Sequence, residues 1–423
     1  MGKSIRDISF KTFIESVKRQ ELRDFTKRRI GAINKLDIKV KSADNFGEMR
    51  QHILKQYSDT DVVKSFEDHN GQIWDCIAVN KQPALNGTNR EIANAPDISS
   101  QVSKERVDKI PGTKRAASFL SDKKQDKYGN VLSCPEGYVP VRRIRLEEMI
   151  RFESLQNFFK KTPRLHVPDR TFPVDVNRTL QKHKYAHAAQ EVVNTGGHSV
   201  LSINSPVLQG SEIFSLSQQW YTAGDGESLQ TIEGGWQVFP SKYDTQEPCL
   251  FIYYTADNYH SENGYNLETN AFCQSSNKWA LGGPLIDTEN AGGDGALELD
   301  MTWALVDGKW WLYLNGNTPD DAVGYYPVEI FSGGPMSVKA NYIDYGGETV
   351  GTDSWPEMGS GAFPDTGAAA YQRNINYFDL QGSGFWADLR ISEDFPNCYK
   401  IGLTSSDSWG TYFYYGGPGG RNC

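Results

Sequence analysis

The pattern of apolar and polar positions divides the chain into two parts with different periodicities. In the first part, apolar residues recur at helical spacing with Lys and Arg on the opposite face, at Ile5, Ile8, Phe10, Phe13, Ile14, Val17 and Leu22. A second helix is predicted within "GEMRQHILKQY", residues 47–57. Short strands follow between residues 73 and 144, around a polar, basic stretch at 101–128 that we expect to form a loop.

Beyond residue 185 the helical spacing ends. Short aromatic and β-branched runs alternate there with Gly, Asn and Asp turns, as in "EIFSLSQQWYTAG", "CLFIYYTAD" and "GKWWLYLNG". This pattern predicts an antiparallel all-β domain, a sandwich or a jelly roll. The expected fold is thus an all-β domain over residues 181–423, preceded by a smaller α+β domain over 1–159.

A proline-containing segment joins the two predicted domains. The stretch "KKTPRLHVPDRTFPVDV", residues 160–176, has evenly spaced prolines and scattered charges, which are typical of an extended, exposed linker. Linkers of this kind are preferred sites of proteolytic cleavage. We therefore expect residues 160–180 to be a processing region, with Pro163, Pro168 and Pro173 as candidate positions.

The charge is distributed unevenly between the two parts. Residues 1–185 carry 36 Lys and Arg against 24 Asp and Glu, a net charge of +12. Residues 186–423 carry 8 against 29, a net charge of −21. Opposite charges of this size favour docking of the two domains on each other.

The chain contains six cysteines, two in the first part and four in the second. An even number in each domain favours disulfides, and so an oxidising compartment. The start "MGKSIRDISF" has no apolar signal-peptide core, so we expect a secreted protein whose signal has been removed. No run of residues has the length and apolar character of a membrane span.

Several familiar catalytic patterns are missing or incomplete. No G-x-S-x-G motif occurs, and the sequence around Ser360 lacks its spacing. Asp365-Thr366-Gly367 matches the tripeptide of aspartic peptidases, but one copy cannot form their carboxylate pair, and a turn after Pro364 is the better interpretation. The acids of 287–300 match no EF-hand spacing. The sequence predicts no metal and no cofactor.

Two glutamates remain, each next to a Gly-Gly pair inside an apolar strand pattern. Glu233 precedes two glycines in "TIEGGWQVFP", residues 231–240, and Glu348 follows two in "DYGGETV", residues 344–350. In a regular strand Glu233 shares a face with Gly235 and Gln237, opposite the apolar side chains. Glycine beside a carboxylate lets another backbone approach closely, as an extended peptide substrate must.

If the two strands are neighbours, the two carboxylates converge on one cleft. Two nearby carboxyl groups do not both ionise easily, so one stays protonated while the other acts as a base. That combination suits attack of water on an amide. The alternative for either strand alone is a solvent-facing glutamate beside a bulge or bend.

The residues resemble the neprosin family, plant-type glutamic peptidases that cleave after proline. Two stretches look like the family's activation peptide: "DCIAVNKQPAL" and "CPEGYVPVRRI". Seven others follow in the order of its catalytic domain: "HKYAHA", "FSLSQQW", "TIEGGWQV", "LFIYYTADNY", "GYYPVEIF", "YGGETV" and "EMGSGAFP". The resemblance implies a β-sandwich with a glutamate dyad at Glu233 and Glu348. It also implies an inactive zymogen activated at acidic pH, with an activation peptide at about 60–150.

The resemblance further implies disulfides between Cys76 and Cys134 and between Cys398 and Cys423. The family's short cysteine-closed loop is altered in "ENGYNLETNAFCQSS", so Cys249 is expected to pair with Cys273 instead. Residues 1–70 have no counterpart in the family pattern. The motif around Glu348 has a tyrosine where the family commonly has tryptophan.

These considerations predict a secreted, acid-activated glutamic endopeptidase, monomeric, that cleaves after proline in peptides or proteins. Its own pro-domain is the expected partner, with no nucleic acid and no membrane. Substrate contacts are expected at Gly235, Trp236, Gln237, Tyr345, Gly346, Gly347 and Ser360. Two alternatives stay open. A non-catalytic lectin-like sandwich could bind carbohydrate in an aromatic cleft, and a glycoside hydrolase also uses paired carboxylates.

Overall fold

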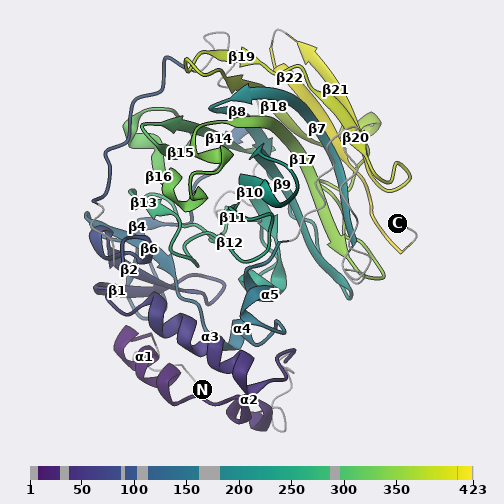
Figure 1. Cartoon of the computed structure of the whole chain (residues 1–423). Coiled ribbons are helices and arrows are strands. Elements are labelled where there is room, and N and C mark those ends of the chain that lie inside the picture. The colour runs from purple at the N-terminus through teal and green to yellow at the C-terminus, as the bar shows by residue number, and fades with distance from the viewer. Residues whose placement is uncertain are drawn as a thin grey trace.

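The computed structural model describes residues 8–28, 38–86, 91–101, 113–161, 182–285, 296–406, 408–421 and 423. Figure 1 shows a large two-layered β structure with a smaller helical and β part at one end. We call residues 8–161 the N-terminal part and residues 182–423 the sandwich. The predicted fold class, an all-β domain preceded by a smaller α+β domain, is confirmed.

The N-terminal part contains five α-helices and two small sheets. The helices are α1 (Phe10–Arg19), α2 (Leu22–Arg28), α3 (Ala43–Gln56), α4 (Leu146–Met149) and α5 (Leu155–Phe159). A three-stranded sheet has the order β1 (Val62–Glu67), β2 (Ile73–Ala78), β6 (Tyr138–Arg142). A two-stranded sheet pairs β4 (Ser121–Gln125) with β5 (Val131–Leu132).

Local sequence explains the helices. The Ser42 side chain caps α3 by accepting hydrogen bonds from two backbone N–H groups of its first turn. Phe46, Met49 and Ile53 then form one buried stripe at helical spacing. The two predicted helices are thus present. The predicted loop at 101–128 is partly wrong, because β4 and the short strand β3 (Thr113–Arg115) lie within it.

The sandwich consists of two sheets. The seven-stranded sheet has the order β12 (Asn263–Tyr265), β11 (Cys249–Thr255), β10 (Gln230–Val238), β9 (Glu212–Ala223), β17 (Ala340–Gly351), β7 (Lys182–Asn194), β20 (Arg390–Glu393). The second sheet has the order β13 (Cys273–Gln274), β16 (Ala322–Pro327), β15 (Lys309–Leu314), β14 (Ala296–Val306), β8 (Gly196–Ser202), β18 (Ala370–Phe378), β22 (Gly410–Gly416), β21 (Lys400–Ser406). In this second sheet β19 (Gly384–Trp386) pairs with β18, and β3 pairs with β14.

Short helical turns connect the strands. One is the α-helical turn α6 (Pro240–Tyr243); the 3-10 turns are Val79–Lys81, Pro83–Leu85, Gly226–Ser228, Pro319–Asp321, Val328–Phe331, Pro335–Ser337 and Pro364–Thr366. The last of these is the turn expected after Pro364, and Gly367 closes it with a positive φ of 72°. No helix in the described part of the chain is long and apolar enough to cross a membrane.

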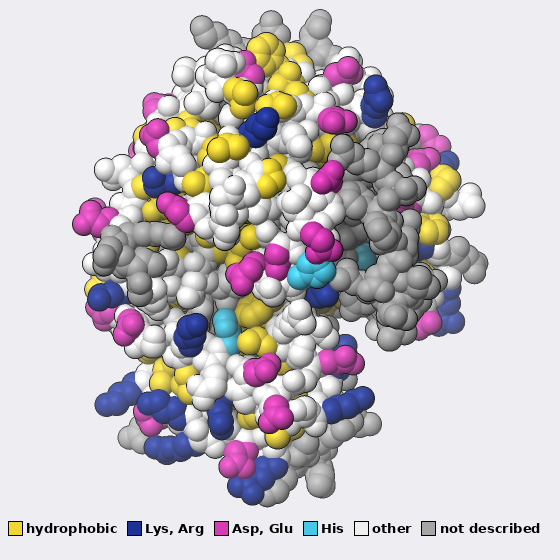
Figure 2. Space-filling view, in the orientation of Figure 1, with side chains coloured by type: hydrophobic (Ala, Val, Ile, Leu, Met, Phe, Trp, Pro, Cys, Tyr) yellow, Lys and Arg dark blue, Asp and Glu magenta, His cyan; other side chains and the backbone are white. Residues whose placement is uncertain are grey.

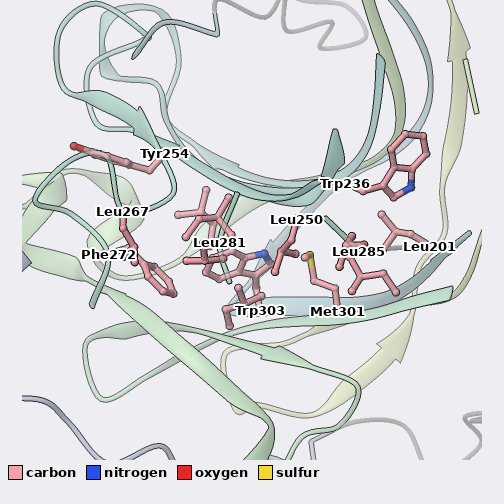
Figure 3. Close-up of a cluster of buried hydrophobic side chains, with 14 of the residues drawn as sticks. Leu201, Trp236, Leu250, Tyr254, Leu267, Phe272, Leu281, Leu285, Met301 and Trp303 are labelled. Carbon is pink, nitrogen blue, oxygen red and sulfur yellow. The ribbon is translucent and has the colours of Figure 1, made fainter. Parts of the chain in front are cut away.

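The hydrophobic core lies between the two sheets. Trp236 and Leu250 of the seven-stranded sheet face Leu201, Met301 and Trp303 of the second sheet, and all five are buried (Figure 3). We call this the inner face of the seven-stranded sheet. Its opposite face carries Glu233 and Glu348, and we call it the site face.

The N-terminal part is bound to the sandwich by ion pairs of one polarity. Each pair joins a basic residue of the N-terminal part to an acidic residue of the sandwich. The pairs are Arg115–Asp300, Arg142–Glu268, Arg145–Asp244, Arg151–Asp244 and His69–Glu247. The two closest of these contacts are His69–Glu247 at 2.8 Å and Arg151–Asp244 at 2.9 Å. Figure 2 shows Lys and Arg side chains gathered over the helical end. The docking expected from the opposite charges is therefore present.

The N-terminal part also reaches the outer face of the second sheet. Ala84, Leu85 and Ile98 pack there against aromatic residues of β15 and β16. The Ile98 backbone N–H donates to the Asn317 carbonyl at 3.0 Å, and β3 adds to β14 as a parallel strand. In Figure 1 this stretch of chain runs along the side of the sandwich.

The structure contains disulfides between Cys76 and Cys134 and between Cys398 and Cys423, as the resemblance implies. The expected pairing of Cys249 with Cys273 is wrong. Cys249 lies in a cluster on the site face of the seven-stranded sheet, and Cys273 lies in a cluster on the outer face of the second sheet. The whole core of the sandwich separates them.

Candidate active site

The two glutamates lie on the same face of one sheet, but their strands are not neighbours. Strand β9 pairs with β10 on one side and with β17 on the other. Glu233 lies opposite Trp220 of β9, and Glu348 lies opposite Leu216 of the same strand. Strands β10 and β17 are thus about 10 Å apart, twice the spacing of paired strands, and the two glutamates are also offset by four residues along β9. The expectation of adjacent strands is wrong, yet the shared face is retained.

The ammonium of Lys161 fills the space between the two carboxylates. Its Nζ lies 2.5 Å from Oε2 of Glu233 and 3.1 Å from Oε2 of Glu348. It also donates to Oε1 of Gln218 at 2.7 Å. Gln218 lies on β9, opposite Gly235 and Gly346, so its side chain rises between the two glutamates. All three N–H groups of the ammonium have an acceptor, and the side chains of Lys161 and both glutamates are 0% exposed.

The other oxygen of each carboxylate is held by the sandwich itself. Oε1 of Glu233 accepts from the hydroxyls of Thr231 at 3.1 Å and Tyr259 at 2.8 Å. Oε1 of Glu348 lies 2.5 Å from Nδ1 of His183 and accepts from the Tyr185 hydroxyl at 3.3 Å. Both Oε1 atoms are therefore fixed, and both Oε2 atoms are directed at the same point.

Glu348 is ionised in this environment. Burial by itself raises the pKa of a carboxyl group, but the Lys161 ammonium and the His183 imidazole outweigh it. The pKa of Glu348 therefore lies below its ordinary value. It follows that His183 donates its Nδ1 hydrogen to the carboxylate.

Aromatic side chains line the site. The Lys161 ammonium lies 4.6 Å from the ring centre of Trp220 and 5.7 Å from that of Phe251. The Lys161 backbone N–H donates to the Tyr253 hydroxyl at 3.2 Å, and that hydroxyl donates to Asn263 at 2.9 Å. These rings exclude water and strengthen the electrostatic interactions between the charged groups.

The predicted substrate-contacting residues divide between the two faces. Gly235, Gln237 and Gly346 lie on the site face. Trp236 lies on the inner face, where its indole N–H donates to the Ser202 carbonyl at 2.8 Å. Tyr345 also points inward, with its hydroxyl 3.2 Å from that of Tyr221.

Two further predicted positions fail to reach the site. A Cβ at Gly347 would meet Met358 of the core at 2.6 Å, so this residue faces inward as well. Ser360 lies in an exposed loop and donates to the Ala368 carbonyl at 2.7 Å. Period-two alternation explains the errors at Trp236, Tyr345 and Gly347, because residues next to each other in a strand point to opposite faces.

The glycines have a structural role within the sheet. A Cβ at Gly235 would lie 2.0 Å from the Ser217 carbonyl oxygen of β9, and one at Gly346 would lie 2.4 Å from the Ala186 carbonyl oxygen of β7. The glycines therefore permit close approach of β10 to β9 and of β17 to β7. The predicted close approach of a substrate at these positions stays a prediction.

Sequence reasoning missed Lys161, His183, Tyr185, Gln218 and Tyr259. Lys161 was assigned to an exposed linker, whereas it is buried; the rest of that linker, with Pro163, Pro168 and Pro173, lies outside the described residues. The alternating "HKYAHA" pattern places His183, Tyr185 and His187 on one face of a strand. This alternation could have identified His183 and Tyr185 as candidate site residues. Three other histidines of the sandwich have acidic partners: His187 with Asp344, His198 with Asp300 and His260 with Glu227.

The geometry thus defines a β-sandwich with a buried pair of glutamates covered by an N-terminal segment. Residues 211–418 match the family described as Neprosin, and residues 65–189 match the Neprosin activation peptide. The chain belongs to the neprosin family, and the matched activation peptide supports a peptidase zymogen. Residues 8–64, with helices α1 to α3, lie outside both matches.

Two solved structures are similar over the sandwich. A scytalido-glutamic peptidase with a transition state analog inhibitor is 9% identical, with 56% of this chain and 99% of that chain covered and a TM-score of 0.33. SCP-B, a member of the eqolisin family of peptidases in a complex with the tripeptide Ala-Ile-His, is 10% identical, with the same coverage and a TM-score of 0.28.

Proposed function

We propose that the protein is a secreted glutamic endopeptidase that is made as a latent precursor and cleaves after proline. The observation that carries the proposal is the convergence of both glutamates on one buried ammonium. Two carboxylates that hold a single small group between them are arranged to hold a water molecule and a substrate carbonyl in its place. Family membership supports the peptidase class.

The reaction assigns one role to each carboxylate. The ionised carboxylate takes a proton from water as the water oxygen attacks the scissile carbonyl carbon. The protonated carboxyl group donates a hydrogen bond to the carbonyl oxygen as that oxygen becomes negative. The proton taken from water then passes to the leaving amine, the C–N bond breaks, and a carboxylic acid product remains.

Latency follows from the position of Lys161. Its ammonium pairs with both glutamates and occupies the point to which their Oε2 atoms are directed. Because the N-terminal part supplies this lysine, release of that part removes the block. We propose that cleavage within residues 160–180, after Pro163, Pro168 or Pro173, completes activation.

Acid weakens the block. The pKa of Glu348 is lowered in the docked state, so its ion pair stabilises docking fully above the ordinary value of 4.5. That stabilisation is lost as the pH falls through the lowered pKa, when the carboxylate takes up a proton. Acid activation is therefore expected below about pH 4.5, near the ordinary range of carboxyl groups.

The test is an acid-incubation time course of the full chain at about pH 3 to 4, a range that brackets the free-carboxyl pKa. Intact mass and cleavage of a proline-containing peptide are followed for the wild type, Glu348→Gln and Asp344→Asn. Asp344 is a matched control because it is a buried carboxylate of the same strand and face, held by His187.

We expect the wild type and Asp344→Asn to lose the N-terminal part and cleave the peptide, while Glu348→Gln stays intact and inactive. Sugar binding or oligosaccharide hydrolysis without peptide cleavage would reject the proposal and favour the lectin-like or glycosidase alternative. A new N-terminus that does not follow proline would reject self-processing after proline alone.

A further inference from the structure

His183 makes the shortest contact that the sandwich itself provides to either glutamate. It is the second residue of β7 and lies opposite Val350, while Tyr185 lies opposite Glu348. His183 is thus diagonal to Glu348 across a strand pair, a relation that lets long side chains meet. Its Nδ1 lies 2.5 Å from Oε1 of Glu348, and its side chain is 7% exposed.

The imidazole ring is held in place by its neighbours. It stacks on Tyr185 with an interplanar angle of 17°, and it contacts Phe214 of β9 edge-on, with ring centres 6.0 Å apart. Both aromatic residues belong to the sandwich, as does Glu348. The His183–Glu348 contact is therefore built into the sandwich and does not depend on Lys161.

The two glutamates differ in what holds them. Glu233 accepts only from hydroxyl groups at Oε1, whereas Glu348 accepts from an imidazole and a hydroxyl. An imidazole that donates to a carboxylate favours its ionised form, and it can also carry a positive charge. After release of Lys161, only Glu348 keeps a nitrogen donor at Oε1.

Among the described residues, His183 contacts Glu348 of β17, Tyr185 of β7 and the uncharged Phe214 of β9. Lys161 of the N-terminal part contacts the other carboxylate oxygen of Glu348. His187, two residues beyond Tyr185 on the same face, is engaged with a different carboxylate, Asp344, at 2.7 Å.

Resting on the proposed function, we propose that His183 is a positioning residue that makes Glu348 the base of the dyad. Its Nδ1–H holds Oε1, which turns Oε2 toward the attacking water. Glu233, held by neutral hydroxyls, is left as the protonated partner that donates to the substrate carbonyl. The different surroundings of the two carboxyl groups thus assign their roles.

Four variants test this, each measured after acid activation: His183→Gln, His183→Asn, His187→Gln and Glu348→Gln. In the His183→Asn variant, the amide nitrogen takes the place of Nδ1 and can still donate to Glu348. We expect His183→Gln to lower kcat about 10- to 100-fold with little change in KM, the effect typical of losing an orienting partner. The acidic limb of its kcat–pH profile should move to higher pH. His183→Asn should keep most of kcat.

His187→Gln is the matched control, because it makes the same change at a buried histidine–carboxylate contact on the same strand face. It should lower thermal stability but leave the kcat–pH profile unchanged. If Glu348→Gln is inactive while His183→Gln keeps the wild-type kcat and profile, the role of His183 is rejected and the proposed function stands. If the wild type itself shows no cleavage that depends on Glu348, the proposed function fails.

A measurement without activity covers the case in which His183→Gln does not fold. The ring nitrogens of the histidines are followed by ¹⁵N NMR in the wild type and in Glu348→Gln, both as full chains. We expect the His183 ring signals to shift on this substitution by much more than the His187 signals, because His187 has Asp344 as its direct partner. An unchanged His183 ring would overturn the inference.

Discussion

The inner and site faces of the seven-stranded sheet are equally buried but chemically opposite. On the inner face, Ile232, Trp236 and Tyr221 pack against the second sheet, and the hydrophobic effect favours their burial, while the polar groups of Trp236 and Tyr221 have hydrogen-bond partners. On the site face, Glu233 and Glu348 are also fully buried, and burial of such charges is unfavourable unless they are paired.

The source of the pairing group distinguishes the two faces. The inner face is covered by another sheet of the same sandwich. Around the glutamates, the site face is covered by residues 152–161 of the N-terminal part. Lys161 pairs with the glutamates, Phe152 packs against Phe239, and Gln156 donates a hydrogen bond to the His260 carbonyl. A functional face can thus be kept dry by a segment that is separable from the fold.

Substitution of Lys161 should have the largest effect of the changes predicted here, because Lys161 pairs with both glutamates of the site face. Loss of one partner from a buried ionic cluster costs about 3–5 kcal/mol, because the remaining charges stay buried without compensation. We expect Lys161→Met to cleave a proline-containing peptide without acid treatment, while the wild type does not. Activity at pH 7 and susceptibility to limited proteolysis are the measurements.

Lys160→Met is the control for that experiment, because it removes the adjacent lysine, whose side chain is only half-buried. This variant should remain latent. A Lys161→Met protein that is as latent as the wild type would contradict the role of Lys161 as the block.

Substitution of Trp236 should destabilise the packing of the inner face against the second sheet. Trp→Ala in a core typically costs about 3–5 kcal/mol of unfolding free energy. We expect Trp236→Ala to lower the denaturation midpoint strongly and to leave KM for a peptide unchanged wherever the protein remains folded. A raised KM at unchanged stability would support the predicted contact of Trp236 with the substrate.

His52 of α3 should make a smaller contribution, which concerns the pH dependence of docking. Its Nε2 contacts the Glu268 carbonyl at 3.1 Å, and burial lowers its pKa from 6.5 to about 4. The released state binds a proton more readily than the docked state. Docking therefore weakens as the pH falls from 6.5 toward 4, by about 2–3 kcal/mol.

His52→Gln keeps a donor for the Glu268 carbonyl but cannot take up a proton. We expect its N-terminal part to be released at a lower pH than in the wild type. Hydrogen exchange of β9 and β10 across this pH range measures the release. A midpoint that is unchanged or higher would contradict the contribution of His52.

Substitution of Cys249 or Cys273, the two cysteines outside the disulfides, should have the smallest effect on the unfolding free energy. Each of Cys249→Ala and Cys273→Ala removes one buried sulfur and should cost about 1 kcal/mol. Alkylation of the denatured, unreduced chain should label both thiols, whereas intact Cys76–Cys134 and Cys398–Cys423 disulfides are not labelled. Complete protection of Cys249 and Cys273 would support the pairing that the structure contradicts.

The sequence predicted those features that depend on local periodicity. Alternation placed Glu233 with Gly235 and Gln237 on one face, and the composition change near residue 185 separated the two parts. The strand order could not be predicted from this periodicity, because β9 and β17 pair residues at least 120 positions apart in the chain. The position of Lys161 was equally hidden, since the prolines that follow it favour an exposed linker.

The errors have two origins. Trp236, Tyr345 and Gly347 were included because they lie close to Glu233 and Glu348 in sequence, although strand geometry turns neighbouring residues to opposite faces. The Cys249–Cys273 pairing rested on the altered cysteine-closed loop of the family pattern, and a loop sequence cannot show on which side of a sandwich a thiol lies.

The most direct test of the account is a comparison of Glu233→Gln, Glu348→Gln and the double variant, each after removal of the N-terminal part. If the two glutamates act as one catalytic unit, each single variant should lose nearly all peptide hydrolysis, and the double variant should lose no more. The losses would then be strongly non-additive. If either single variant retains substantial activity, or if the two losses add independently, the two glutamates do not form one active site and the central claim is wrong.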